Sequence, residues 1–168
     1  IYEGRLDEAE TWLNRSKEIR EQIKDSRGLS YCLHGLGLLA LERKNWSEAV
    51  ELLTLAHQSR ASLGLKNETI ESLSYLAKAH LLAGDPAQAL VDSTQAVESM
   101  AQQKEMQEAP QIYFNHARVL SANNISESEE YEKMARQALD RQVQRIADPQ
   151  EREIFLAKNR INREILGS

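Results

Sequence analysis

The sequence repeats with a period of 40 residues, and this period limits the chain to a small set of folds. Ala9, Ala49 and Ala89 are separated by 40 residues each and stand in similar surroundings. The segments that align around them without gaps are residues 4–16, 44–56 and 84–96. A fixed period of roughly 20 to 50 residues is typical of arrays in which each unit packs against the next. We therefore expect a chain of stacked units rather than one domain built around a central core.

Each repeat contains two stretches with the spacing of an amphipathic α-helix. Leu33, Leu36 and Ala40 follow one another at intervals of three and four residues, and Leu53 follows Ala49 in the same way. With 7 glycines, 3 prolines and 5% aromatic residues, the composition disfavours a β-sandwich or a β-barrel. The predicted helices are residues 6–25, 29–43, 46–63, 68–83, 86–103, 109–122, 126–146 and 149–165.

Short polar motifs mark the expected helix ends. Asp85 followed by Pro86 has the pattern of an N-cap residue with proline in the first helical position. Ser126 and Glu129 have the spacing of a capping box, in which each side chain bonds to a backbone amide of the other residue. Ile1 and Tyr2 are expected to end an earlier helix that lies mostly outside the chain.

Small residues mark the expected contacts between helices. Gly37 and Ala77 occupy one phase of the repeat, where a bulky side chain would push the neighbouring helix away. The last repeat is irregular, and a two-residue insertion would place Tyr131, Ala135 and Ala138 in the packed phase.

The pattern L-x2-L-G-x2-A followed by N-W-x2-A-x3-L-x2-A resembles the tetratricopeptide repeat (TPR). The residues that carry it are Leu33, Leu36, Gly37, Ala40, Asn45, Trp46, Ala49, Leu53 and Ala56. That family has a unit of about 34 residues, so each helix here is expected to be about three residues longer. The resemblance implies an all-α, right-handed solenoid of antiparallel helix pairs, closed by a C-terminal capping helix.

We expect TPR-like repeats over residues 1–146 and a capping helix with a tail over residues 147–168. The expected repeats are about 1–27, which is partial, then 28–66, 67–106 and 107–146. In the capping helix, Ile154, Lys158, Ile161 and Ile165 would share one face. Such a helix, apolar on one side and charged on the other, can close a stack of repeats.

The tail also resembles the segment that follows such repeats in bacterial nucleotide-cyclase and ATPase-type regulators. The matching residues are Asp148, Pro149, Arg152, Phe155, Leu156, Asn162, Arg163, Ile165 and Leu166. Where that family often has Val-Pro, this chain has Arg160-Ile161. The resemblance implies a place near the C-terminus of a larger cytoplasmic signalling protein, with further domains on the N-terminal side.

Composition and motifs argue against several functions. A net charge of −5 disfavours a general nucleic-acid binder, and no apolar run approaches the roughly 20 residues of a membrane span. The single Cys32 excludes an internal disulfide framework, and it points away from His34 because the two stand two residues apart on a helix. Phosphate-binding loops and helical zinc motifs are absent. We therefore predict no catalysis, no cofactor, no metal, no nucleic-acid partner and no membrane partner.

The first helices of stacked pairs line the concave side of a solenoid. We predict that a protein or peptide binds there. The candidate residues are Tyr31, His34, Leu38, Tyr75, Lys78, Phe114, Asn115 and Arg118. Aromatic residues and arginine supply much of the binding energy at protein interfaces, and Lys78 and Arg118 share one phase in adjacent repeats. Such a pair can hold an acidic side chain, although too few polar groups match the carboxylate clamp of some family members.

The sequence is compatible with three alternatives. The groove could be filled by another domain of the same polypeptide. The chain could form a homodimer through the exposed face of helix 6–25, which carries Trp12, Leu13, Ile19 and Ile23. A small-ligand or enzymatic site around His34 and Tyr75 would require an enclosed pocket with convergent polar groups.

Overall fold

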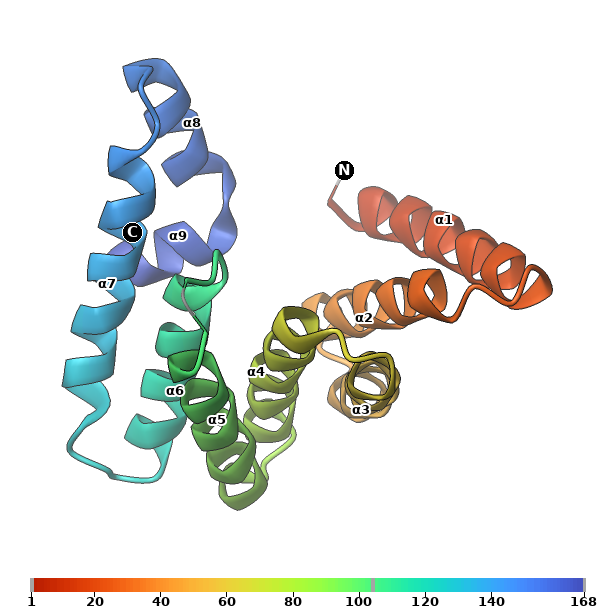
Figure 1. The fold of residues 1–168 in the computed structure, drawn as a ribbon, viewed down its shortest axis with the longest axis horizontal. Helices are drawn as coiled ribbons and strands as arrows, with labels where there is room; N and C mark the ends of the chain where they lie inside the picture. Colours follow the sequence, from red (N-terminus) through yellow and green to blue (C-terminus); the bar gives the residue numbers. More distant parts are fainter. Residues whose placement is uncertain (1, 104, 168) are drawn as a thin grey trace.

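A computed structural model describes residues 2–103 and 105–167 of the chain. In these two ranges the protein has nine α-helices and no strand. Figure 1 shows how the helices are arranged. The helices are α1 (Tyr2–Gln22), α2 (Ser26–Glu42), α3 (Trp46–Ser62), α4 (Lys66–Leu82), α5 (Pro86–Ala101), α6 (Ala109–Ala122), α7 (Ser128–Gln144), α8 (Pro149–Lys158) and α9 (Arg160–Leu166). The predicted all-α class is confirmed.

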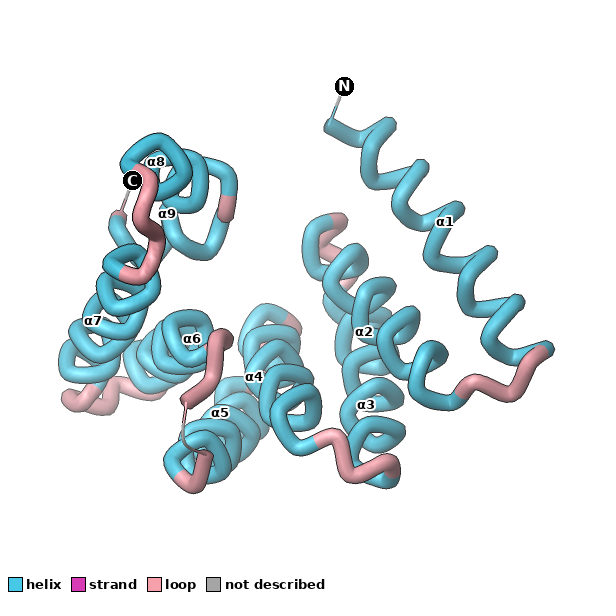
Figure 2. The backbone as a smooth tube through the Cα atoms, turned by 45° about the horizontal axis from the view of Figure 1, so that its top comes forward, coloured by secondary structure: helices cyan, strands magenta, loops and turns pink. Residues whose placement is uncertain are grey.

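Consecutive helices pack as antiparallel pairs, and each pair stacks on the next. Helix α2 packs on α3, α4 on α5, and α6 on α7, while α3–α4 and α5–α6 contacts join the pairs. Helices α2, α4 and α6 are the first helices of their pairs, and α4 contacts both of the others. In Figure 2, α1 lies at one end and α8 and α9 at the other, with α4 between them. This arrangement is a TPR-like α-solenoid.

The turns between helices share one conformation. Lys24, Lys44, Gly64 and Gly84 have φ values of 56°, 61°, 69° and 87°, in the left-handed region. They are 20 residues apart, which is half of the sequence period. The residue that follows each of them donates its backbone amide to a carbonyl five residues before it, as Asp25 does to Arg20, with N–O distances between 2.9 and 3.0 Å. This hydrogen bond ends a helix, so a regular repeat consists of two helices of similar length and two equivalent turns.

The two predicted caps have different outcomes. The Asp85 side chain accepts a hydrogen bond from the Gln88 amide at 3.0 Å, as expected of an N-cap. The capping box at Ser126 is wrong: α7 begins only at Ser128, and the Ser126 hydroxyl donates to the Glu127 carboxylate. The backbone continues in turn conformation through residues 126 and 127, which moves the helix start beyond the reach of the Ser126 side chain.

Helix α1 begins at Tyr2, not at residue 6, so Tyr2 does not end an earlier helix. Ile1 lies outside the described residues. The physical reason is that a single glycine in a helix costs only about 1 kcal/mol, so Gly4 does not interrupt α1.

Close contacts between helices fall at the predicted small residues. A Cβ atom on Gly37 would lie 2.7 Å from Leu53 Cγ, well inside van der Waals contact. Ala77 and Ala89 are fully buried and belong to one apolar cluster. In the last pair, Ala135 and Ala138 are also buried and Tyr131 is half-buried, so these three positions pack as expected.

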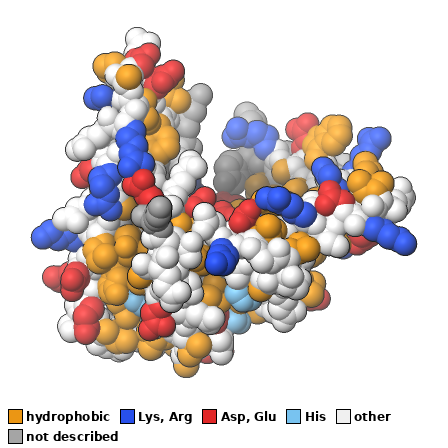
Figure 3. Space-filling model, viewed as in Figure 1, with side chains coloured by type: hydrophobic (Ala, Val, Ile, Leu, Met, Phe, Trp, Pro, Cys, Tyr) orange, Lys and Arg blue, Asp and Glu red, His pale blue; other side chains and the backbone are white. Residues whose placement is uncertain are grey.

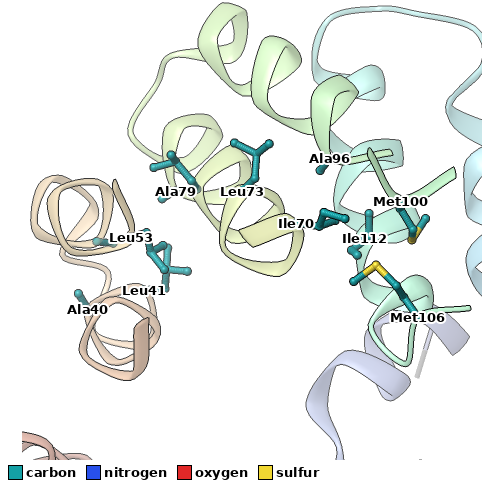
Figure 4. Packing of buried hydrophobic residues seen from close by; sticks show 12 residues of the cluster. Ala40, Leu41, Leu53, Ile70, Leu73, Ala79, Ala96, Met100, Met106 and Ile112 are labelled. Carbon is teal, nitrogen blue, oxygen red and sulfur yellow. The ribbon is translucent and has the colours of Figure 1, made fainter. Parts of the chain in front are cut away.

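The main core is continuous through the central helices rather than confined to one pair. Figure 4 shows Ile70 of α4, Ile112 of α6 and Met100 of α5 pointing toward one another, with Met106 from the following loop. The same cluster includes Ala40 and Leu41 of α2 and Leu53 of α3. Each pair therefore buries its apolar side chains partly against its neighbours, as expected of a solenoid.

The predicted single capping helix over residues 149–165 is wrong. The chain breaks at Asn159, which has an extended backbone with ψ 115°, and α9 starts again at Arg160. The Asn159 side chain accepts from the Ile161 amide at 3.1 Å and thereby caps α9. The expected apolar face is therefore divided, since the side chain of Ile154 is 49% exposed and that of Ile165 is 2% exposed. The side chain of Lys158 lies outside the described residues.

Candidate protein-binding site

Two pockets lie side by side along α4, and we call them together the groove. The Tyr75 pocket has a volume of about 360 Å³ and the Arg118 pocket a volume of about 450 Å³. Most of the lining side chains come from α2, α4, α6 and α9, and Trp46 of α3, Gln142 of α7 and Phe155 of α8 add to them, as do nearby loops. Charged side chains of both signs gather along the hollow between the α1–α2 and α7–α9 parts of the molecule (Figure 3).

Five of the eight predicted binding residues line the groove: Tyr75, Lys78, Phe114, Asn115 and Arg118. The three predicted residues of α2 are placed differently. Leu38 is half-buried against the main core, and His34 is buried beside α4. Tyr31 is 43% exposed, but its hydroxyl is already used in a hydrogen bond to α4.

His34 is a structural residue at the contact between α2 and α4. Its Nδ1 atom lies 3.3 Å from the Ser72 hydroxyl, and its ring meets the Tyr75 ring edge-on with centroids 5.5 Å apart. Burial and the nearby Arg60 charge lower the pKa of His34 to about 3. Glu71 stands 3.7 Å from Nε2, but this contact does not outweigh burial. His34 is therefore neutral near pH 7 and contributes packing rather than charge.

Arg60 is a buried residue that we did not select from the sequence. Its side chain is 1% exposed, and Nη1 donates to the Ser72 hydroxyl at 2.6 Å and to the Glu68 carbonyl at 3.0 Å. The Glu71 carboxylate lies 3.2 Å away, and the guanidinium stands 5.0 Å from the centre of the Tyr31 ring. A signal was present, because Arg60 continues the buried phase of Leu53 and Ala56.

The polar residues that surround Arg60 also fix the position of Tyr31. The Tyr31 hydroxyl donates to Glu68 at 2.8 Å, and this hydrogen bond is the main reason that the pKa of Glu68 is lowered. Burial has the opposite effect on Glu71 and raises the pKa of its carboxyl. The α2–α4 contact is thus held partly by polar side chains, which leaves the aromatic face of Tyr31 against Arg60.

Asn115 lines the Arg118 pocket but its amide group is used within the fold. It donates to the Ser74 carbonyl at 3.3 Å and to the Ser74 hydroxyl at 3.1 Å, and Gln111 donates to the same hydroxyl. Asn115 is only 3% exposed. It therefore joins α6 to α4 and shapes the floor of the pocket.

Lys78 and Arg118 are the two predicted cations, and both line the groove. Lys78 is half-buried and lines both pockets, and Arg118 is exposed and lines the larger one. Burial lowers the pKa of Lys78, Glu164 acts against this, and Arg160 lowers it further. Among the described residues, no carboxylate lies within 4.0 Å of either cation. The pair could therefore accept an acidic group from outside.

Helix α9 reaches the groove from the C-terminal end of the molecule. The Arg160 guanidinium donates to Glu42 of α2 at 2.5 Å and to Glu164 at 2.7 Å. At the other end of α9, Ile165 is buried against Ala135 and Leu139 of α7. Part of the predicted concave surface is therefore already bordered by a segment of the same chain, which the sequence did not indicate.

Other kinds of site receive no support from the described residues. In residues 2–103 and 105–167, no group of three or more His, Cys, Asp or Glu side chains is placed to hold a metal ion. Cys32 is buried, with its sulfur 3.4 Å from the Ser16 hydroxyl. His80 and His116 hydrogen bond to Asp92 and Ser93. None of the helices in the described ranges has both the length and the apolar character that crossing a bilayer requires.

Comparison with known proteins agrees with the fold. No curated protein matches the chain. The model of the tetratricopeptide repeat family matches residues 1–62, which span α1, α2 and α3. This match to the first three helices agrees with the TPR-like α-solenoid that the antiparallel helix pairs of the described chain form.

Proposed function

We propose that the groove binds a segment of another protein, or of a neighbouring domain of the same polypeptide, and that the chain is a non-catalytic interaction module. Tetratricopeptide repeats generally mediate protein–protein interaction. The observation that carries the proposal is the pair Lys78 and Arg118, which line one pocket without a carboxylate partner among the described residues. Leu81 and Phe114 add apolar surface beside them.

The chemistry of this pair favours a partner that presents a carboxylate. A half-buried ammonium with no carboxylate within 4.0 Å is costly, and an ionised acceptor at hydrogen-bond distance relieves that cost. Arg118 offers a planar guanidinium that can bind both oxygens of the same carboxylate. The adjacent aromatic and aliphatic side chains can hold an apolar residue next to that acidic one.

The proposal is tested with the whole chain as bait in a lysate of the organism from which the sequence comes. The variant Lys78→Glu/Arg118→Glu reverses both groove charges. The matched control Lys133→Glu/Arg136→Glu makes the same charge change at two exposed positions of α7. Circular dichroism first establishes that all three proteins have equal helicity and melting temperature.

A protein retained by the wild type and the α7 control but lost by the groove variant supports the proposal. Equal retention by all three places recognition elsewhere on the molecule and contradicts it. Binding that both variants lose equally reports the net charge of the protein rather than the groove.

The wider setting is also part of the proposal. We place this module in a larger, cytoplasmic bacterial signalling protein. The support is the resemblance of residues 148–166 to the tails of bacterial regulators. In such a protein the bound segment could belong to another domain of the same polypeptide.

Self-association through α1 is a second candidate function. Trp12, Ile19 and Ile23 are 61%, 47% and 61% exposed, although all three are large apolar residues. They line a shallow depression on α1 with Arg15, whose guanidinium lies 6.0 Å from the centre of the Trp12 ring. Exposed apolar patches of this kind often mark interfaces.

Sedimentation equilibrium over a wide concentration range separates the two candidates. Self-association predicts a dimer that Trp12→Glu/Ile23→Lys converts to a monomer. Val91→Glu, which changes a 58% exposed side chain of α5, is the control and should leave the dimer intact. A monomer at all concentrations contradicts this second candidate and leaves the first untouched.

A further inference from the structure

The two pockets of the groove share four residues, and all four are charged: Glu42, Lys78, Arg160 and Glu164. They come from α2, α4 and α9, so the partition between the pockets is built from three helices. Its centre is Arg160, which donates to Glu42 at 2.5 Å and to Glu164 at 2.7 Å. Arg160 and Glu42 are 118 residues apart in the sequence, and their ion pair joins the C-terminal helix to α2 across the groove.

The charges of the Arg118 pocket do not balance. The Arg118 pocket contains four cationic residues, which are Lys44, Lys78, Arg118 and Arg160. It contains two carboxylates, those of Glu42 and Glu164, and Arg160 binds both of them. Glu164 raises the pKa of Lys78 but does not come within 4.0 Å of its ammonium. The Tyr75 pocket adds a third carboxylate, that of Glu108. The shortage of negative charge therefore lies at the Arg118 pocket, in a chain whose net charge is −5.

The ion pair between Arg160 and Glu42 is suited to exchange its partners. The two side chains are 57% and 33% exposed, and exposed ion pairs contribute little to stability. The C-terminal end of α9 is fixed independently, because Ile165 is 2% exposed among residues of α7. Asn162 also donates to the Phe155 carbonyl at 3.0 Å, which ties α9 to α8. Arg160 can thus leave Glu42 without the C-terminal segment losing its place.

The Arg118 pocket also has apolar side chains next to these charged residues. Trp46, Leu81 and Phe114 line the Arg118 pocket beside the cations. A segment lying along α4 would meet these side chains first and the partition next. Its acidic residues would then compete with Glu42 and Glu164 for the same cations.

We propose that the Arg160–Glu42 ion pair is a latch across the groove, and that the partner is an acidic segment whose carboxylates replace Glu42 and Glu164 at Arg160 and Lys78. Opening the latch joins the Tyr75 and Arg118 pockets into one binding surface along α4. This inference rests on the proposed function, because it concerns the partner and the control of the same groove.

The test measures binding of a fluorescein-labelled hexaglutamate peptide to the full chain by fluorescence anisotropy at low ionic strength. Glu42→Gln and Glu164→Gln each remove one competing carboxylate and keep the shape of the side chain. Glu51→Gln removes the same charge from an exposed position of α3 that lines neither pocket, and it is the matched control. Lys78→Gln removes the proposed binding cation.

We expect Glu42→Gln and Glu164→Gln to lower the Kd by roughly threefold or more relative to Glu51→Gln, as loss of an exposed competing ion pair allows. Lys78→Gln should raise the Kd above that of the wild type. Hydrogen exchange gives a second readout, because the peptide should speed exchange of the first amides of α9 in the wild type. That effect should be smaller in Glu42→Gln, in which the latch is already open.

The outcomes separate this inference from the proposed function. If Lys78→Gln weakens binding but the two latch variants behave like Glu51→Gln, the groove binds acidic segments and the latch is wrong. If hexaglutamate binds to none of the proteins, or binds equally to all of them, the acidic partner is contradicted. The proposed function then depends on the lysate experiment alone, which does not assume the latch.

Discussion

At the scale of single residues, the absence of a side chain is what allows α2 and α3 to pack closely. Gly37 faces Leu53, and its missing Cβ would lie 2.7 Å from Leu53 Cγ and 3.3 Å from the Leu53 backbone nitrogen. Gly35, two residues earlier, faces the end of the Leu13 side chain at 2.9 Å. A backbone atom cannot move aside as a flexible side chain can, so the two glycines differ in what they tolerate.

Alanine substitution should therefore separate the two positions. In a helix, Gly→Ala gains about 0.5–1 kcal/mol from lower backbone entropy, and this gain applies to both. Gly37→Ala should nevertheless lower the free energy of unfolding by about 1–3 kcal/mol, because the core around Leu53 is overpacked. Gly35→Ala should change it by less than about 1 kcal/mol. Urea unfolding followed by circular dichroism measures both, and equal effects would contradict the argument.

His34 gives the fold a dependence on pH. Its pKa is about 3 in the folded protein and 6.5 in a solvated histidine, so protons bind preferentially to the unfolded chain. Stability is therefore complete above pH 6.5 and falls as the pH drops from 6.5 toward 3. Burial lowers the pKa of His116 as well, so part of the loss belongs to that residue.

Replacing His34 should reduce this loss. Between pH 7 and pH 5, we expect the free energy of unfolding of His34→Gln to fall by about 2 kcal/mol less than that of the wild type. This value follows from about 1.4 kcal/mol for each pH unit below 6.5. Thermal unfolding at both pH values measures the difference. His57→Gln, which replaces a half-buried histidine bonded to the Thr69 carbonyl, is the comparison. An unchanged pH dependence in His34→Gln would show that His34 is already protonated or solvated.

At the scale of the helices, the ends are set by backbone conformation and only sometimes by capping side chains. The left-handed residues Lys24, Lys44, Gly64 and Gly84 end four successive helices. Asp25, Asp85 and Asp148 then accept hydrogen bonds from backbone amides at the start of the next helix. Helices α3, α4, α6 and α7 begin without a capping hydrogen bond from a side chain.

Asp85 and Ser126 form a matched pair for testing this distinction. Asp85→Ala should lower the free energy of unfolding by about 1 kcal/mol, because it leaves the Gln88 amide without its acceptor. Ser126→Ala should change it by no more than about 0.5 kcal/mol, since the hydroxyl contacts only an exposed carboxylate. Denaturant unfolding of the two variants checks both values. A loss at Ser126 similar to that at Asp85 would restore the predicted capping box.

At the scale of the whole molecule, the number of neighbours of each helix determines its stability. Helix α4 packs against α2, α3, α5 and α6, whereas α1 contacts only α2 among the described helices. In a solenoid, stability is approximately the sum of units and of contacts between neighbours. The middle of the array should therefore open last.

Hydrogen exchange followed by mass spectrometry should show this gradient. We expect amides of α4 to exchange only with global unfolding, and those of α1 at least about tenfold faster. The measurement is made at low protein concentration, because self-association through Trp12 and Ile23 would protect α1. Equal protection of α1 and α4 in a monomer would mean that the array unfolds as one cooperative unit.

The sequence alone was sufficient for the class of fold and for most of its helices. Period, apolar spacing and small residues are local properties, and Gly37, Ala77, Ala89 and Ala135 were assigned to contacts that the structure contains. The groove was predicted less well, because Asn115 and His34 share the phase of exposed residues but are buried by the neighbouring first helix. How far that helix overlaps them depends on the stacking of pairs, which no single repeat encodes.

Two features depended on the tertiary structure. The break at Asn159 lies in a stretch whose residues are all compatible with a helix, and it occurs where Ile165 can pack against α7. The approach of Arg160 to Glu42 follows from the curvature added by every pair between α2 and α9. Local spacing determines which residues are helical and which face inward, because those choices involve a few neighbours. Whether two residues meet across the groove depends on how far each helix pair is rotated relative to the next. These rotations add up along the array, so only the complete fold determines such contacts.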